Sequence, residues 1–380
     1  MSKTVYLDCN ATAPLRLEAE QAVVRALKAG GNPSSVHALG RAARRTVEDA
    51  REQVRGLVHA PKNARVIFTS GGTEANVLTL LGCGRDKLFA PRTEHPSVLM
   101  TQDRFKAGMT TIRVDANGLI DPFELEELFA GGGDDVLVSV MLANNETGVL
   151  QQVEGIVRMA HRYDALVHTD AVQAAGKIDV DFAAMGCDYL TLASHKLGGP
   201  QGVGALIATA DAPLLALQAG GGQEGGLRGG TENVSGIAGF GAACAAAKAG
   251  RETDMKRIAA LRDRLEAQIT ALAPDARVIA GQADRLPNTS LMVMPGVASD
   301  SQLMAFDLAG ICVSAGSACA SGKTKASGVL MAMGIPAEQA KCAVRVSFGP
   351  MNTEEDVESF FSAWKDLYER SGQKRKRSAA

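Results

Sequence analysis

The chain has 380 residues, of which 46% are hydrophobic and 22% are charged, and its formal net charge is −2. This composition excludes a wholly disordered chain, and the balanced charge gives no reason to expect binding to nucleic acid or to an anionic membrane. Glycine is in excess, at 41 residues, so we expect the backbone to turn tightly or to approach a ligand closely at many positions. At about 100–200 residues per domain, the length predicts two or three domains.

The seven cysteines form no CxxC pair, and their spacing matches neither a zinc site nor a disulfide framework. The first residues lack the apolar core of a secretory signal, and the longest uncharged stretch of small residues, 234–247, is too short to cross a bilayer. We therefore expect a cytoplasmic protein that is not attached to a membrane and in which most cysteines are small core residues. No resident metal ion is expected.

Short β-branched runs alternate with helical patterns over the first 232 residues. In chain order, we expect a helix at 35–57, a strand at 66–69, a helix at 73–81, a strand at 136–143, a helix at 154–163, and strands at 165–169, 189–193 and 204–209. This alternation predicts an α/β fold in which helices cover both faces of a mostly parallel sheet.

A second, smaller α+β unit is predicted after about residue 232. Its expected elements are an alanine-rich helix at 234–272, a strand at 290–294, a helix at 301–308, a strand at 311–314, a helix at 327–333, a strand at 343–348 and a helix at 353–368. The basic tail at 374–377 is expected to be a solvated, disordered end.

Ligands of open α/β sheets bind at the carboxyl ends of the strands, so the residues that follow each strand are candidates. The strand at 66–69 leads into Ser70-Gly71-Gly72-Thr73-Glu74. This segment is either an anion cradle at the start of a helix or an ordinary helix N-cap at Thr73. Asp170 follows the strand at 165–169. It is either a partly buried carboxylate that requires a positive or N–H partner, or the N-cap of the next helix.

Lys196 follows the strand at 189–193 and precedes a glycine-rich turn. It is either an exposed lysine at a strand end or a desolvated, nucleophilic amine suited to a Schiff base. An anion cradle, an acidic partner and a nucleophilic lysine at one sheet edge match the phosphate, the pyridinium nitrogen and the aldehyde of pyridoxal phosphate. The sequence therefore predicts pyridoxal phosphate as the cofactor.

Cys319 differs from the other cysteines because the loop around it, residues 314–323, contains no large apolar residue that would bury it. We therefore expect an exposed, reactive thiol, and the nearby Lys323 and Lys325 favour its thiolate form.

With these motifs, the chain resembles the cysteine desulfurases of the NifS/IscS type, which are pyridoxal-phosphate enzymes of fold type I in the class V aminotransferase family. The resemblance runs from Tyr6 to about Trp364. It rests on Gly31-Asn32-Pro33-Ser34-Ser35-Val36-His37, Ser70-Gly71-Gly72-Thr73-Glu74, Thr93-Glu94-His95, Asn144-Asn145-Glu146-Thr147-Gly148, His168-Thr169-Asp170-Ala171-Val172-Gln173, His195-Lys196, Gly220-Gly221-Gly222-Gln223-Glu224, Arg228-Gly229-Gly230-Thr231-Glu232-Asn233 and Gly316-Ser317-Ala318-Cys319. It implies a large cofactor-binding domain at residues 16–250 and a small domain at residues 1–15 and 251–380, which carries the Cys319 loop.

The resemblance also implies the roles of individual residues. Lys196 holds the cofactor covalently, Asp170 pairs with its pyridinium nitrogen, and His95 stacks on its ring and shuttles protons. Further cofactor contacts are implied for Gly72, Thr73, Asn145, Gln173, Ser194, His195 and, from the neighbouring subunit, Thr231. The substrate carboxylate is bound by Arg345, with Asn32 and Asn145 at the substrate side, and Cys319 accepts the sulfur.

By this resemblance, the protein removes sulfur from L-cysteine, which leaves L-alanine and a persulfide on Cys319. The implied partners are L-cysteine, a second copy of the chain in a homodimer, and an iron–sulfur scaffold or another sulfur acceptor. Cys319 is also able to ligate an iron–sulfur cluster transiently. Three alternatives stay open: a selenocysteine lyase, a cysteine sulfinate desulfinase and, in a different class, a non-catalytic sulfur-relay scaffold.

Overall fold

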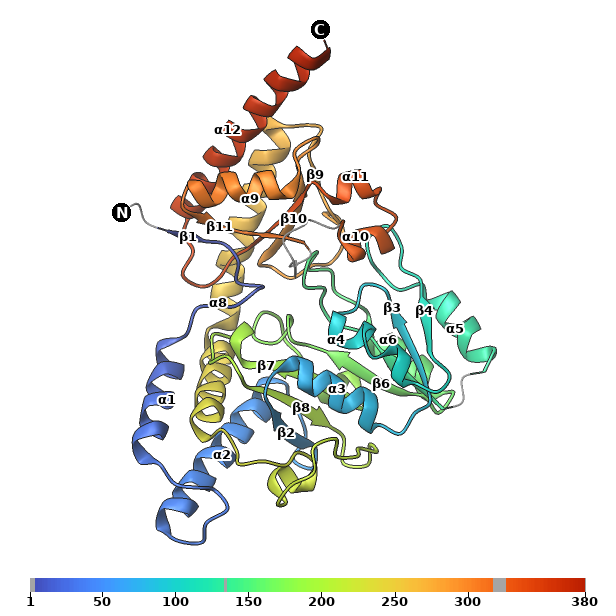
Figure 1. The fold of residues 1–380 in the computed structure, drawn as a ribbon, viewed down its shortest axis with the longest axis vertical. Helices are drawn as coiled ribbons and strands as arrows, with labels where there is room; N and C mark the ends of the chain where they lie inside the picture. Colours follow the sequence, from blue (N-terminus) through green and yellow to red (C-terminus); the bar gives the residue numbers. More distant parts are fainter. Residues whose placement is uncertain (1–3, 133–134, 317–325, 380) are drawn as a thin grey trace.

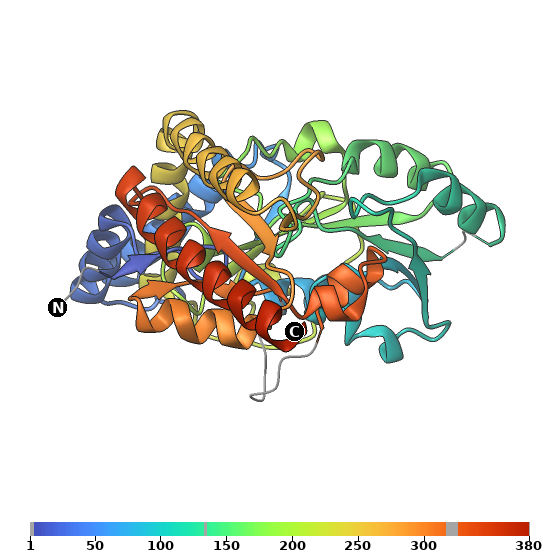
Figure 2. The ribbon, with the colours of Figure 1, turned by 90° about the horizontal axis from the view of Figure 1, so that it is seen from above.

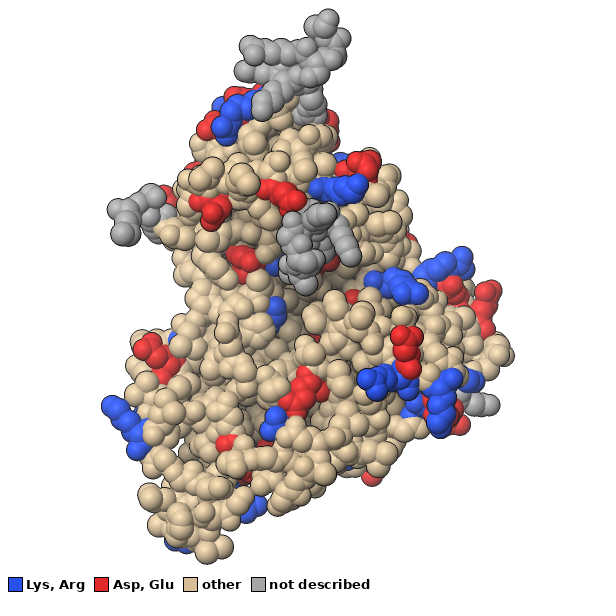
Figure 3. All heavy atoms as spheres, in the orientation of Figure 1, with Lys and Arg blue, Asp and Glu red and all other residues tan. Residues whose placement is uncertain are grey.

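The computed structural model describes residues 4–132, 135–316 and 326–379. Figure 1 shows a larger lower part built on one wide sheet and a smaller upper part, with helix α8 running through both. On the face drawn in Figure 3, lysine and arginine side chains intermingle with aspartate and glutamate side chains and form no large patch of one sign. None of the described helices is long and apolar enough to cross a membrane.

The larger part is organised around a seven-stranded sheet with the order β2-β8-β7-β6-β5-β3-β4. Strand β8 runs antiparallel to both of its neighbours, and the remaining neighbours pair in parallel. The predicted α/β fold with a mostly parallel sheet is therefore confirmed. The strands are β2 (Arg65–Thr69), β3 (Lys87–Pro91), β4 (Met109–Ile112), β5 (Val136–Ser139), β6 (Leu166–Asp170), β7 (Tyr189–Ala193) and β8 (Gly204–Ala208).

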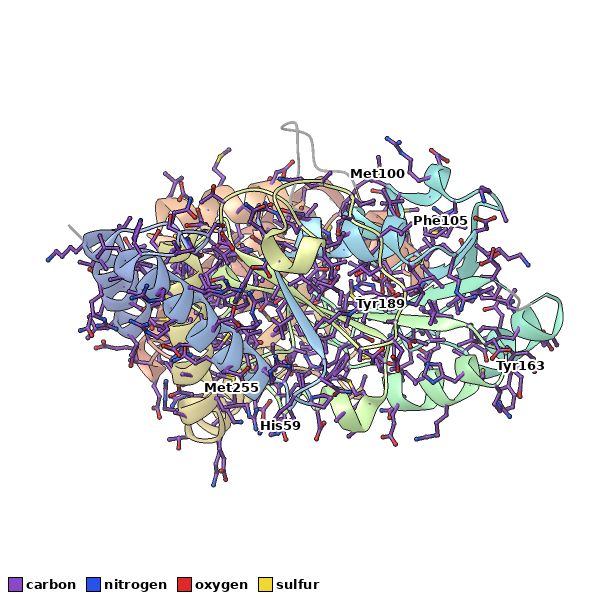
Figure 4. All side chains as sticks on the ribbon, turned by 90° about the horizontal axis from the view of Figure 1, so that it is seen from below. His59, Met100, Phe105, Tyr163, Tyr189 and Met255 are labelled. Carbon is purple, nitrogen blue, oxygen red and sulfur yellow. The ribbon has the colours of Figure 1, made fainter. Side chains whose placement is uncertain are left out.

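Successive residues of these strands enter hydrophobic cores on opposite faces of the sheet, as the two-residue period of a strand requires. Val66 and Phe68 join the core beneath α2 and α8, while Ile67 joins the core beneath α3. Tyr189, labelled near the centre of Figure 4, is fully buried on the α3 side. The covering helices are α1 (Leu17–Ala29), α2 (Ala38–Leu57), α3 (Gly72–Gly82), α4 (Pro96–Leu99), α5 (Pro122–Ala130), α6 (Val153–His161) and α7 (Phe182–Met185).

Helix α8 spans Val234–Leu272, the range that the sequence predicts. Its first half buries residues such as Phe240 in the core of the large sheet, whereas its second half buries residues such as Leu261 in a separate core. At about 1.5 Å per residue, its 39 residues extend for about 58 Å. The predicted boundary between residues 250 and 251 falls inside this continuous helix, and the division into domains stays a prediction.

The smaller part contains a four-stranded sheet with the order β12-β13-β10-β9, and a two-stranded sheet in which β1 pairs with β11. The N-terminal strand is therefore held by a segment some 300 residues later in the chain. Figure 2 shows α8, α9 and α12 gathered on one side of these strands. The elements are β1 (Val5–Tyr6), β9 (Arg277–Val278), β10 (Thr289–Val293), α9 (Ser299–Leu308), β11 (Ile311–Cys312), β12 (Ser314–Ala315), α10 (Gly328–Ala332), α11 (Ala337–Ala340), β13 (Ala343–Ser347) and α12 (Glu354–Ala379).

Several bounds differ from the sequence predictions; the strand expected at 136–143, for example, ends at Ser139. Three of the differences have a clear structural basis. The strand expected at 311–314 is two short strands, because β11 pairs with β1 whereas β12 pairs with β13 in another sheet. Helix α2 begins at Ala38, three residues later than predicted, because the His37 side chain caps it by accepting a hydrogen bond from the Gly40 N–H. The backbone of α12 continues to Ala379, so the prediction of a disordered end is wrong.

Candidate active site

A pocket of about 330 Å³ lies where the carboxyl ends of β6 and β7 meet the N-terminus of α3 and strand β13 of the smaller part. It brings together nine of the predicted site residues from segments far apart in the sequence. These are Gly72, Thr73, His95, Asn145, Asp170, Gln173, His195, Lys196 and Arg345. Gly316, the last described residue before the Cys319 loop, also lines it.

Asp170 is the last residue of β6 and is buried, with 8% of its surface exposed. Its Oδ2 accepts a hydrogen bond from Asn76 Nδ2 at 2.8 Å, and its Oδ1 accepts one from the Val172 N–H at 3.0 Å. These donors meet the requirement of a buried carboxylate for N–H partners. The chain after Asp170 forms turns and not a helix, so the alternative role of Asp170 as a helix N-cap is wrong.

Lys196 ends a 3₁₀ turn (Ser194–Lys196) that follows β7, and it is half-buried. Its Nζ donates to the backbone oxygens of Asn10 and Ala11, at 2.5 and 2.8 Å. Burial lowers the pKa of Lys196 to about 8, and the neighbouring Arg345 adds to this effect. A neutral, nucleophilic amine is therefore accessible near neutral pH, and the alternative of an exposed lysine at a strand end is wrong.

His95 stands at the N-cap of α4, where its Nδ1 accepts from the Ser97 N–H at 3.1 Å and lies 2.7 Å from Ser97 Oγ. The ring is open to the pocket, yet the protein around it removes enough water to lower its pKa, and Lys196 acts in the same direction. Burial likewise lowers the pKa of His195 to about 4. Burial therefore favours the neutral form of both imidazoles, although Asp170 opposes this effect at His95.

The anion cradle is formed by the first residues of α3. The N-cap of this helix is Gly71, with no side-chain cap, so the alternative reading of Thr73 as the N-cap is wrong. The unpaired N–H groups of a helix N-terminus favour an anion. Gly204 of β8 packs against the cradle so closely that a Cβ there would lie 2.5 Å from the carbonyl carbon of Gly71. The glycine is thus required by a close approach of two backbones.

Arg345 lies in the middle of β13 and is 5% exposed. Its Nη1 donates to the backbone oxygen of Asn145 and its Nη2 to Asp8 Oδ1, both at 2.8 Å. Its Nε is buried without a hydrogen-bond partner among the described residues. A buried guanidinium with an unsatisfied N–H has capacity to bind a carboxylate that enters the pocket.

Three predicted residues do not reach this pocket. Ser194 is wrong as a pocket residue, because its buried Oγ faces Gly199 and has no hydrogen-bond partner within the described chain. Asn32 is exposed on the connection between α1 and α2 and does not line the pocket that Arg345 lines. Thr231 is exposed on the loop before α8. Cys319 lies outside the described residues.

Sequence reasoning missed three buried residues that organise the site, Asn10, Asn76 and Lys177. The Asn10 oxygens accept from Lys196, Gln173, Lys177 and Asn288. Burial lowers the pKa of Lys177 to about 7. A signal was available in Lys177, which follows Gln173 by four residues and donates to its Oε1 at 2.9 Å.

Comparison with known proteins identifies the family. The model of the family described as Aminotransferase class-V matches residues 5–360. The chain belongs to this family. It is 42% identical to "Cysteine desulfurase" of Cereibacter sphaeroides over 365 residues, which cover 93% of each chain. It is 38% identical to "Cysteine desulfurase NifS" of Azotobacter vinelandii, and the match covers 93% of this chain and 90% of that one. The solved structure "X-ray structure of NifS-like protein from Rickettsia africae ESF-5" is similar with a TM-score of 0.89 and 34% identity, over 97% of this chain and all of that one.

Class V aminotransferases use pyridoxal phosphate, and this member has the fold type I architecture that the resemblance implied. The residues present fit the cofactor. The cradle at Gly72 and Thr73 suits its phosphate, the carboxylate of Asp170 suits a pyridinium nitrogen, and the amine of Lys196 suits its aldehyde. These three groups line the same pocket, so one cofactor molecule is able to meet all of them.

Proposed function

We propose that this class V aminotransferase family member is a cysteine desulfurase, which takes sulfur from L-cysteine with the help of pyridoxal phosphate and releases L-alanine. The observation that carries the proposal is the joint placement, in one pocket, of the Lys196 amine, the Asp170 carboxylate, His95 and the Arg345 guanidinium. The relatives called cysteine desulfurase match this chain over nearly its whole length.

Within this proposal, Lys196 binds the cofactor, Asp170 pairs with its ring nitrogen, and His95 packs on its ring. The phosphate is held by the first residues of α3 and by His195, while Gln173 and Asn145 lie beside the ring. The lowered pKa of Lys196 supports its role, because a neutral amine both attaches the cofactor and takes a proton from the substrate Cα. When bound, the cofactor withdraws electrons from the substrate carbons and so makes the C–S bond easier to break.

Arg345 is the proposed anchor of the substrate carboxylate. Its fork of N–H donors matches a carboxylate in a bidentate arrangement, and its Nε has no partner among the described residues. Asp8, which pairs with Nη2, occupies part of the fork. Substrate binding therefore exchanges one carboxylate for another at Arg345, or adds a second carboxylate beside the first.

Cys319 is the proposed sulfur acceptor. Its thiolate attacks the substrate sulfur, a new S–S bond forms, and the C–S bond breaks with its electron pair moving to carbon, which then takes a proton to give L-alanine. A persulfide stays on Cys319. Gly316 supports this role, because it lines the pocket only three residues before Cys319. The proposed nucleophile therefore follows a residue of the site by three positions in the sequence.

The finer features of the proposal concern partners. We infer a homodimer in the cytoplasm, in which Thr231 reaches the cofactor phosphate of the neighbouring subunit, since its exposed position leaves it free to contact a second chain. Exposed apolar side chains on α1 and its flank, such as Leu17 and Leu27, are consistent with a covered face. The sulfur then passes to an iron–sulfur scaffold or to another acceptor protein.

The proposal is tested by supplying L-cysteine and a reductant to the full chain loaded with pyridoxal phosphate, and by measuring sulfide and L-alanine. We expect equal amounts of the two products and loss of both in Lys196→Ala. The matched control Lys106→Ala removes an exposed lysine paired with Asp86 and is expected to keep full activity. Alanine without sulfide, or neither product, would contradict the proposal. A higher rate with L-selenocysteine than with L-cysteine would favour a selenocysteine lyase.

A further inference from the structure

An unbroken chain of hydrogen bonds joins His95 to Asp170 through two residues that the proposed reaction does not use. His95 Nδ1 lies 2.7 Å from Ser97 Oγ, Ser97 Oγ lies 2.9 Å from Asn76 Nδ2, and the same Nδ2 lies 2.8 Å from Asp170 Oδ2. Asn76 is 1% exposed, and Ser97 and Asp170 are also buried. Solvent therefore does not compete for the two hydrogen bonds of Asn76, whereas the contact between His95 and Ser97 is part-buried.

Asn76 determines which group donates and which accepts in this series of hydrogen bonds. The carboxylate of Asp170 accepts hydrogen bonds only, so the amide nitrogen of Asn76, and not its oxygen, must face it. The second proton of this NH₂ group then points to Ser97 Oγ. A flipped amide would place Oδ1 against the carboxylate, with two acceptors in contact. Asn76 Oδ1 consequently has no partner in the described part of the chain.

Ser97 in turn acts as a hydrogen-bond donor to His95. Its hydroxyl accepts from Asn76, which leaves the hydroxyl proton available for His95 Nδ1. The backbone N–H of Ser97 donates to the same nitrogen, at 3.1 Å. With two donors directed at it, Nδ1 must carry a lone pair and no proton. In a neutral imidazole the proton then lies on Nε2.

We propose that Asn76 and Ser97 are positioning residues that hold His95 as the neutral tautomer with its proton on Nε2. The structural part of this inference stands on the contacts alone, while its importance for catalysis rests on the proposed function. Through Nε2–H, His95 donates a hydrogen bond in the pocket. It does not take up a proton at Nδ1 without displacing both donors from Ser97. Asp170 and His95, which flank the proposed cofactor ring, are thereby coupled.

The test is nitrogen-15 NMR of the side chains in the full chain loaded with pyridoxal phosphate, with the His95 signals assigned by comparison with His95→Gln. In the wild type we expect one nitrogen without a proton, identified as Nδ1, and one protonated nitrogen, identified as Nε2. In Ser97→Ala and Asn76→Ala, the two signals should move toward each other as a second protonation form becomes populated. Ser97→Thr keeps the hydroxyl and should restore the wild-type pattern.

A matched control removes another buried hydroxyl four residues later, between α4 and the 3₁₀ turn that follows it. Thr101 Oγ1 donates to the Val98 oxygen at 2.6 Å and does not touch His95, so Thr101→Val should leave the His95 signals unchanged. For Ser97→Ala we also expect a fall in kcat/KM of roughly five- to tenfold, which corresponds to the net free energy that one hydrogen bond contributes. A proton on Nδ1 in the wild type, or unchanged His95 signals in both Ser97→Ala and Asn76→Ala, would overturn the proposal. Because the NMR signals require no turnover, inactivity toward L-cysteine would contradict the proposed function and leave this inference standing.

Discussion

Asp8 and Arg345 form an ion pair at the edge of the proposed active site, with Arg345 Nη2 2.8 Å from Asp8 Oδ1. The two residues are 337 positions apart in the sequence and are joined by the fold of the smaller part. Ser314 Oγ, at the start of β12, donates to the other oxygen of Asp8 at 2.8 Å. A carboxylate is thus already seated on the guanidinium that we propose as the substrate anchor.

Replacing Asp8 with asparagine should lower the KM for L-cysteine and also lower the melting temperature. The substrate carboxylate no longer competes with Asp8, whereas a buried guanidinium that has lost its counter-charge destabilises the folded chain. Steady-state kinetics and thermal unfolding measure the two effects. The exposed pair of Arg264 and Glu354 provides the control, since Glu354→Gln should change neither quantity. An increase in KM for Asp8→Asn would mean that Asp8 helps to bind substrate.

Replacing Arg345 with lysine should raise KM strongly while the cofactor still binds. A lysine keeps the charge but lacks the planar fork that holds a carboxylate in two hydrogen bonds. Losing one charge-assisted hydrogen bond corresponds to a fall in kcat/KM of roughly ten- to a hundredfold. Kinetics with L-cysteine measure this effect, and the visible absorbance of the bound cofactor should stay as in the wild type. Unchanged kinetics would remove Arg345 from the substrate site.

Attachment of pyridoxal phosphate to Lys196 should depend on pH with a midpoint near pH 8. The reactive species is the neutral amine, and burial lowers the pKa of Lys196 to about 8 from the usual value near 10.5. The rate constant of attachment to the cofactor-free chain should therefore rise up to about pH 8 and then level off. Stopped-flow absorbance measures it. A rate that keeps rising toward pH 10 would indicate an ordinary, solvated lysine.

Gly204→Ala should weaken cofactor binding, although Gly204 itself does not contact the cofactor in our proposal. The new Cβ would lie 2.5 Å from the Gly71 backbone, so the cradle at the start of α3 has to move. Small-to-large changes of this kind cost roughly 1–3 kcal/mol, which corresponds to a loss in affinity of about ten- to a hundredfold. Fluorescence titration with pyridoxal phosphate measures the Kd. Gly56→Ala on α2, where nothing lies within 4 Å, should leave it unchanged.

Much of the fold was predictable because apolar, β-branched runs alternate with long helical patterns. Helix α8 shows this best, since its predicted and observed ends coincide. Strand β3 was missed because a lysine begins it and a proline, Pro91, ends it, which is atypical of an inner strand. Strand β4 was missed because it is an edge strand of only four residues, too short to show a clear two-residue period.

The site was predictable where its residues follow strands. Asp170 and Lys196 stand directly after buried runs, and the carboxyl ends of neighbouring strands meet at one edge. Asn10 and Asn76 were not predictable, since their roles depend on contacts across 94 to 279 residues. The predicted role of Ser194 was wrong, because it depended on the direction of one side chain after β7.

The most direct test of the account is the location of the transferred sulfur. The chain loaded with pyridoxal phosphate is treated with L-cysteine, and its peptides are analysed by mass spectrometry without reductant. We predict one added sulfur atom on the peptide with Cys319 in the wild type and in a control, Cys312→Ala, and none there in Lys196→Ala. Added sulfur on a different cysteine, or equal labelling of Cys319 in Lys196→Ala, would contradict the account.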